Sequence, residues 1–284
     1  MVLVVLFQPC APFFSSTISL TLAKFSGLKD NFLTDHASAF HDAGYTVLFY
    51  DNRCWGDSEG QPRNEVDPPK QARDYFDAFA YAQTLPCVDP ENIFYWGASM
   101  AGGNALIASA VNKRIRGVIV EVPYVTAGQW PSELAAHLIA DRASHQQEDP
   151  TVLPIWPESI EAINNGSSKA LLSTVESLEF EQTLRQLGHP YEAGATLQSL
   201  LNCMVHEPMA FIHRISPVPL LFVSAAKDNT SPYEAQMRAF ALAQEPKKLH
   251  VFEECGHYDL YSGEPMKQNI AVQIAWLQDV LSGR

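Results

Sequence analysis

The sequence predicts a doubly wound α/β fold, in which helices cover both faces of a mostly parallel sheet. Six short segments are apolar throughout, as strands buried on both faces of a parallel sheet are. Helical patterns separate these segments, so the strands are joined by crossover connections, which are right-handed in parallel sheets. The expected strands are Thr17–Ala23, Tyr45–Tyr50, Ile93–Trp96, Gly117–Val122, Pro219–Ala225 and Leu249–Phe252.

The segments between the strands carry the turn and capping residues that open helices. Asp67-Pro68 and Ser231-Pro232 each combine an N-cap side chain with a proline, whose fixed φ suits the first helical turn. The expected helices are Phe32–Ala43, Pro68–Thr84, Met100–Asn112, Pro232–Gln244 and Pro265–Leu281.

A long segment, Val125–Ser216, interrupts this alternation between the fourth and fifth strands. Its strand signal is weak, while Ser132–Arg142 and Ser177–Leu187 have helical periodicity. A structureless loop of about ninety residues is implausible inside a compact domain. We therefore expect a helical cap at 125–216, inserted into a core formed by residues 1–124 and 217–284.

Composition and charge exclude several classes of protein. The 284 residues carry a formal net charge of -13, so the long-range field repels nucleic acid and anionic lipid. Five cysteines without a C-x-x-C pair argue against a disulfide framework and a thiolate metal site, and fit a reducing cytosol. The only hydrophobic leader, Met1–Phe7, is too short to span a membrane. We expect a soluble, cytoplasmic protein without a metal and without nucleic-acid or membrane partners.

One strand exit has the pattern of a nucleophile elbow. The segment Gly97–Ala101 (GASMA) follows the strand Ile93–Trp96, and a helical pattern begins at once. An elbow needs small residues two positions either side of the nucleophile, because its strained turn brings their backbones close together. Gly97 and Ala101 meet this need, although the second position is usually Gly. Ser99 is therefore predicted to project its hydroxyl at the carboxyl ends of the strands, where open α/β sheets bind ligands.

Two further strand exits supply partners for this serine. Asp228 follows the fifth expected strand and His257 the sixth, so Ser, Asp and His occur in the chain order of elbow-type hydrolases. His257 could take the proton of Ser99, while Asp228 fixes the tautomer of the imidazole. Asp259 is a rival acid, but its closeness to His257 in sequence would force a contorted turn. The alternative is that the three are unrelated polar loop residues, but this does not explain why all three follow expected strands.

Several short motifs accompany the predicted triad: Asp51–Arg53, Gly56–Pro68, Asp74-Tyr75, Thr84–Pro86 and Val88–Pro90. They resemble those of serine α/β-hydrolases, and specifically those of fungal polyketide-pathway hydrolases and acyltransferases. The resemblance runs from about Phe25 to the C-terminus and is weakest in the expected cap. It implies the α/β-hydrolase fold, a Ser99–Asp228–His257 triad, no cofactor, and chemistry on an acyl or polyketide-like substrate in secondary metabolism.

The reaction remains open, because one fold supports several chemistries. Hydrolysis of a polyketide-type ester or thioester is the leading interpretation, and acyl transfer to an alcohol or amine is the next. A cyclisation or condensation with His257 as base is the third, and a non-catalytic binding protein is the rival from another class. The expected partner is a small hydrophobic acyl or polyketide substrate, with delivery by a synthase carrier domain and a homodimer as further options.

The sequence departs from these relatives at two places. Where they carry His-Gly or Pro-Gly after the third strand, this chain has Ala23-Lys24. We assign the oxyanion donors to the backbone N–H groups of Phe25 and Met100, because one donor follows the nucleophile and the other comes from this loop. Relatives also carry two more strands near the N-terminus, so either Met1–Phe7 forms one edge strand or the chain is truncated.

Other residues are weaker candidates for the site. His250 is expected to be a core or edge side chain, and buried packing is the favoured interpretation of Cys54 and Trp55. His206 and His213 could line the pocket without acting as bases. The cap residues that could face either an apolar substrate or their own core are Trp130, Trp156, Phe180 and Met204.

Overall fold

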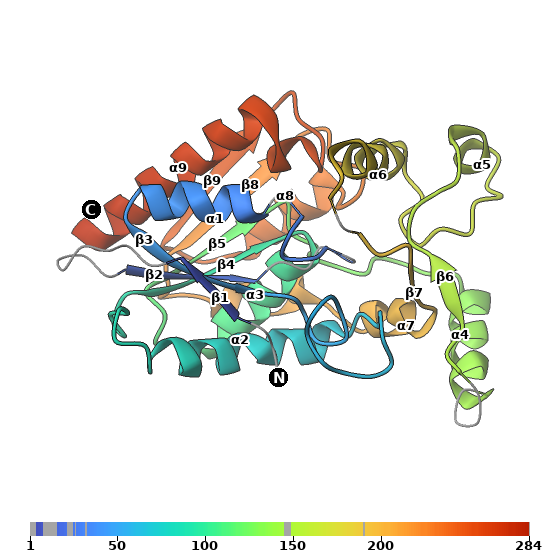
Figure 1. Ribbon diagram of the computed structural model, residues 1–284, viewed down its shortest axis with the longest axis horizontal. Helices are drawn as coiled ribbons and strands as arrows, with labels where there is room; N and C mark the ends of the chain where they lie inside the picture. Colours follow the sequence, from blue (N-terminus) through green and yellow to red (C-terminus); the bar gives the residue numbers. More distant parts are fainter. Residues whose placement is uncertain are drawn as a thin grey trace.

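The computed structural model describes residues 4–7, 16–21, 25, 27–31, 33–144, 149–189 and 191–283 (Figure 1). A sheet with the strand order β1-β3-β2-β4-β5-β8-β9 runs through this part of the chain. The edge strand β1 is antiparallel to β3, and the other neighbouring pairs are parallel. Its strands are β1 (Val4–Phe7), β2 (Ser16–Thr21), β3 (Tyr45–Tyr50), β4 (Ile93–Ala98), β5 (Gly117–Glu121), β8 (Leu220–Ala225) and β9 (Lys247–Phe252).

Helices cover both faces of the sheet, as the sequence predicts. Helices α1 and α9 lie on one face, while α2 and α3 lie on the other (Figure 1). Helix α8 packs on the same face as α2 and α3, because its buried alanines belong to their apolar cluster. The bounds are α1 (Leu33–Asp42), α2 (Pro68–Ala82), α3 (Met100–Val111), α8 (Tyr233–Leu242) and α9 (Gly263–Ser282).

Side-chain alternation along the strands builds a separate core on each face. In β4, Tyr95 joins the cluster beneath α2 and α3, whereas Phe94 and Trp96 join the cluster beneath α1 and α9. Successive side chains of a strand point to opposite faces, so an apolar strand supplies both cores. This explains why the strand segments are apolar throughout.

The expected elements are found with small changes at their ends. Strand β4 continues two residues beyond the expected Trp96, to Ala98, so the elbow starts directly from the strand. The edge strand expected within Met1–Phe7 is β1. Residues 22 and 23 of the first expected strand and Phe32 of the first expected helix lie outside the described residues.

Residues 125–216 hold most of the elements that are not layered on the sheet (Figure 1). The two expected helices are α4 and α6, but this segment also contains an antiparallel strand pair, β6 and β7, that the sequence analysis did not expect. Three-residue strands are too short to give a periodic signal. The segment includes α4 (Ser132–Ser144), β6 (Val152–Pro154), α5 (Ile160–Asn164), α6 (Val175–Leu187), β7 (Gly194–Thr196), α7 (Gln198–Met204) and the short 3-10 turns Pro208–Ala210 and Ile212–Arg214.

Across the described ranges, no helix is both long and apolar enough to cross a membrane.

Candidate active site

Ser99 occupies a strained turn between β4 and α3. Its φ is 54°, in the left-handed region that residues other than glycine rarely adopt. Backbone hydrogen bonds to the end of β5 and the residues after it hold the turn in place. The Ser99 N–H donates to the carbonyl of Glu121 at 2.9 Å, and the Tyr124 N–H donates to the carbonyl of Ser99 at 2.8 Å. Gly97 has no room for a side chain, since a Cβ there would lie 2.3 Å from the carbonyl oxygen of Ala101. The structure thus has the geometry of a nucleophile elbow.

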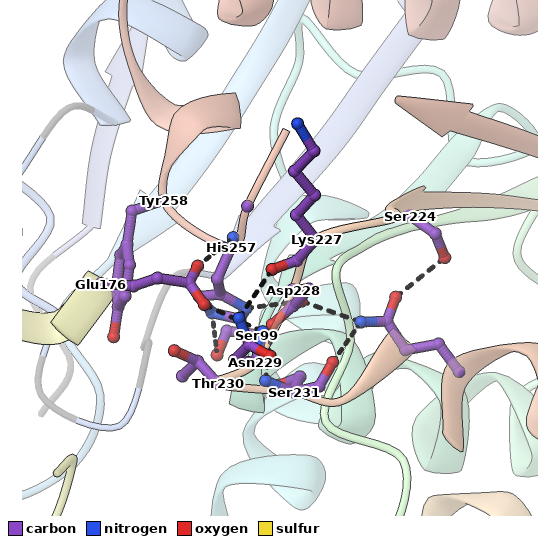
Figure 2. Close-up of polar contacts among 12 residues, drawn as sticks. Ser99, Glu176, Ser224, Lys227, Asp228, Asn229, Thr230, Ser231, His257 and Tyr258 are labelled. Carbon is purple, nitrogen blue, oxygen red and sulfur yellow. Dashed lines mark hydrogen bonds and ion pairs between the residues drawn. The ribbon is translucent and has the colours of Figure 1, made fainter. Parts of the chain in front are cut away.

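The structure brings together the three residues that the sequence analysis selected. The Oγ of Ser99 lies 3.0 Å from Nε2 of His257, and Nδ1 of His257 lies 2.8 Å from Oδ2 of Asp228 (Figure 2). All three side chains are buried, with exposed fractions of 8%, 1% and 3% in that order. Asp259 lies elsewhere, because its carboxylate accepts the Gly256 N–H at 2.7 Å. The acid beside His257 is therefore Asp228.

A buried network orients the Asp228 carboxylate. Its Oδ1 accepts the Ser231 N–H at 2.7 Å, and its Oδ2 accepts Nε2 of Gln236 at 2.8 Å (Figure 2). The Gln236 amide is itself fixed, because its Oε1 accepts the hydroxyl of Ser224 at 2.8 Å. With the imidazole of His257, these contacts occupy both carboxylate oxygens. Each oxygen of this buried carboxylate therefore has a hydrogen-bond partner, as buried polar groups require.

Glu176 of α6 joins the two loops that carry the acid and the base. Its Oε1 accepts the Asn229 N–H at 2.9 Å, and its Oε2 accepts the His257 N–H at 2.6 Å (Figure 2). A Cβ on Gly256 would lie 2.6 Å from Oε2 of Glu176, so a side chain at this position would displace the carboxylate. Glu176 could not be predicted from the sequence, because no local pattern links it to residues more than fifty positions away.

Further contacts attach α6 to the same two loops. The hydroxyls of Thr174 and Thr230 lie 3.4 Å apart, and those of Ser177 and Tyr258 lie 3.1 Å apart. The ring of Phe180 stacks on Tyr258 with centroids 4.4 Å apart. Helix α6 and its N-cap residue are therefore bound directly to the loops around His257 and Asp228.

A cavity of about 360 Å³ opens beside Ser99. Its volume lies within the range of small-molecule sites. Both expected oxyanion donors, Phe25 and Met100, line it, and Met100 begins α3, where backbone N–H groups have no helical acceptor. The other lining residues are mostly apolar and include Tyr124, Trp130, Leu171, Leu172, Leu200 and Cys203.

A buried ion pair anchors the loop that carries Phe25. Nζ of Lys29 lies 2.9 Å from Oδ2 of Asp51 and 2.5 Å from Oδ2 of Asp57, and the Lys29 N–H donates to Oδ1 of Asp51 at 2.7 Å. Burial alone would lower the pKa of Lys29, but the hydrogen bonds to Asp57 and Asp51 outweigh it and raise the pKa above its ordinary value. Lys29 therefore stays charged and ties this loop to the end of β3.

The other candidates separate into lining and packing residues. Two alternatives were open for the four apolar residues of the inserted segment. Trp130 lines the cavity, whereas Trp156, Phe180 and Met204 are absent from its walls. Phe180 instead packs on the loop after β9, and Trp156 borders a separate surface hollow. Cys54 and Trp55 are buried in a packed cluster, as expected.

The three histidines considered as weaker candidates also lie outside the cavity walls. His213 is exposed, and His250 is partly buried in β9. His206 is 2% exposed and stacks on Tyr124 with centroids 6.0 Å apart. Burial lowers the pKa of His206 to about 4, so its ring is neutral near pH 7. From the sequence, His206 and His213 could line the pocket, but neither does.

The cavity also contains a thiol, that of Cys203. Burial raises the pKa of this thiol well above its ordinary value, which disfavours the reactive thiolate. No three His, Cys, Asp or Glu side chains lie together as metal ligands would in the part of the chain that the structure describes. Ser99 is thus the nucleophile candidate that has a base in contact.

Comparison with known proteins agrees with this geometry. Residues 21–268 match the model of the Alpha/beta hydrolase family. A thiohydrolase of Eupenicillium brefeldianum is 33% identical, over 84% of this chain and 78% of the relative. Polyketide transferase grgF of a Penicillium species is 32% identical, over 83% of this chain and 79% of the relative. The crystal structure of the alpha/beta hydrolase GrgF from Penicillium sp. sh18 superposes with a TM-score of 0.84 at 26% identity, covering 99% of both chains. The chain therefore belongs to the alpha/beta hydrolase family.

Proposed function

We propose that this protein is a serine-dependent enzyme that cleaves an acyl ester or thioester of polyketide type. The observation that carries the proposal is the contact of Ser99 with His257 at 3.0 Å, in a turn that opens into an apolar cavity. The names of the relatives, thiohydrolase and polyketide transferase, support the class of substrate.

In the first half of the reaction, Ser99 Oγ attacks the carbonyl carbon while Nε2 of His257 takes the hydroxyl proton. Asp228 keeps Nδ1 protonated and stabilises the imidazolium. The backbone N–H groups of Phe25 and Met100 receive the negative charge that develops on the carbonyl oxygen. The carbon–sulfur or carbon–oxygen bond then breaks, His257 returns the proton to the leaving group, and the acyl group remains on Ser99.

In the second half, a second nucleophile resolves the acyl-enzyme. Water attacks the acyl carbon while His257 removes its proton, the bond from this carbon to Ser99 Oγ then breaks, and His257 returns the proton to Oγ as the free acid leaves. An alcohol or amine in place of water gives an ester or amide, and two of the relatives described as polyketide transferases, grgF and claH of Penicillium crustosum, favour this as the second candidate. Hydrolysis leads because it needs no further binding site.

The test is turnover of an acyl thioester with and without added alcohols and amines. Wild type should release the thiol and the free acid, and Ser99→Ala should lose at least a thousandfold in kcat while remaining folded. A conjugate in place of the free acid would favour acyl transfer. Undiminished turnover by a folded Ser99→Ala variant would overturn the proposal.

A further inference from the structure

The cavity beside Ser99 has one charged group in its wall. Among the described residues that line it, Arg238 of α8 is the only Asp, Glu, Lys or Arg side chain. Near the Asp228 loop, the same wall holds Thr230, Ser231 and Pro232. The rest of the lining is uncharged and mostly apolar. The cavity therefore has a distinct end at which a charged part of a ligand could be recognised.

The position of Arg238 follows from the geometry of α8. Ala235 and Arg238 are three residues apart, so they share one helix face, and Ala235 is buried in the same wall. Arg238 is exposed, and the described residues offer it no ion pair. A guanidinium without a carboxylate partner keeps its five N–H donors available.

We propose that Arg238 forms a subsite for an anionic oxygen group, a carboxylate or a phosphate, on an otherwise apolar acyl substrate. This inference rests on the proposed function of Ser99. Guanidinium groups bind carboxylate and phosphate through two parallel hydrogen bonds, so one residue can set both position and orientation. The net charge of -13 gives the protein a field that repels anions, so an anionic group on the substrate needs a local cation, which Arg238 supplies at the cavity.

The anion can come from either end of the substrate. A carboxylate would belong to the far end of the acyl chain, whereas a phosphate would belong to a thiol arm of the pantetheine phosphate type. Arg238 would bind the carboxylate and the phosphate through the same hydrogen bonds. Pairs of substrates that differ only in one of these two charged groups therefore show which group is bound.

The kinetic test uses two matched substrate pairs. The first pair is the octanoyl thioester of pantetheine 4'-phosphate and that of pantetheine. The second pair is a carboxyl-terminated acyl thioester and its methyl-terminated counterpart, both on N-acetylcysteamine. Arg238→Met should lower kcat/KM for the charged member about tenfold relative to the uncharged member, in at least one pair.

Two further variants serve as controls for the ratio of kcat/KM between the charged and the uncharged substrate of each pair. Arg238→Lys should restore part of the preference, because it keeps the charge without the planar fork. Arg73→Met removes an exposed arginine of α2 that does not line the cavity, and should leave the ratio as in wild type. A loss confined to the first pair assigns the phosphate, and a loss confined to the second assigns the carboxylate. An unchanged ratio in both pairs for Arg238→Met would overturn the subsite.

A binding measurement separates failure of the subsite from failure of the proposed function. In the Ser99→Ala background, Trp130 in the cavity wall provides a fluorescence signal for titration with decyl phosphate, decanoate and decanol. Adding Arg238→Met should weaken binding of the anions about tenfold relative to decanol. If wild type turned over no thioester, a retained anion preference would still support the subsite. Equal weakening of all three ligands would contradict it, whatever the enzyme's activity.

Discussion

The Glu176 carboxylate accepts the backbone N–H of His257 at 2.6 Å, although 81 positions separate the two residues in the sequence. Its other oxygen accepts the N–H of Asn229, the neighbour of Asp228. One carboxylate from the inserted segment therefore fixes the separation of the loops that carry the acid and the base. Figure 2 shows both hydrogen bonds beside Ser99.

Glu176→Gln should lower kcat about tenfold while KM changes less than threefold. The amide keeps one oxygen but turns an N–H group toward one of the two backbone donors, which costs about 1–3 kcal/mol and loosens one loop. Steady-state kinetics measures the split between kcat and KM. The control is Glu179→Gln, an exposed position of α6, which should behave as wild type. Equal kcat values for the two variants would show that Glu176 does not position the loops.

Gly97→Ala should unfold the elbow or destabilise the protein by more than about 3 kcal/mol, because the new methyl would meet backbone atoms that cannot move independently. Ala101→Gly is the matched change on the other side of Ser99. It should cost only about 1–2 kcal/mol, from helix propensity and a lost buried methyl group, and should leave Ser99 reactive. Urea denaturation of both variants checks this order. A Gly97→Ala variant as stable as wild type would contradict the steric account.

Lys29→Met should destabilise the protein by about 3–5 kcal/mol, because it leaves the buried carboxylate of Asp51 without its cation. The double variant Lys29→Met, Asp51→Asn removes both charges and should recover part of this loss. Chemical denaturation gives the free energies of unfolding. If the double variant were less stable than the sum of both single changes predicts, the ion pair would not be what anchors this loop.

The free energy of unfolding should fall as the pH falls from about 6.5 to about 4. Burial lowers the pKa of His206 to about 4 in the folded chain, so over this range only the unfolded chain gains the proton. A difference of this size corresponds to about 3 kcal/mol at most. His206→Phe should flatten this part of the stability profile, whereas the same change at the exposed His213 should not. A profile as steep in His206→Phe as in wild type would assign the acid sensitivity to other groups.

Much of the fold and the central contacts could be predicted from local sequence. The apolar strands report burial on both faces, and the small residues around Ser99 report the tight turn. Chain order then pointed to Asp228 and His257, because parallel strands end at one edge of the sheet. The apolar strands and the small residues are local signals, whereas the meeting of Asp228 and His257 with Ser99 follows from the topology of a parallel sheet.

The rest depends on packing that no local pattern encodes. Glu176 acquires its place only when α6 packs against the loops after β8 and β9, and Arg238 only when α8 packs on the sheet. Trp156 and Phe180 were indistinguishable from Trp130 by composition, yet only Trp130 lines the cavity. Strands β6 and β7 pair across some forty residues, and each is too short to be detected alone.

The reactivity of Ser99 is the most direct evidence for or against a serine mechanism. Wild-type protein is treated with a fluorophosphonate probe, and the modified residue is identified by mass spectrometry. An activated serine reacts, because His257 at 3.0 Å removes its proton, whereas ordinary serines do not. We expect one adduct per chain, on Ser99, with none in Ser99→Ala and slower labelling in Asp228→Asn. Absence of labelling in folded wild type, or labelling that persists in Ser99→Ala, would contradict a serine mechanism at this site.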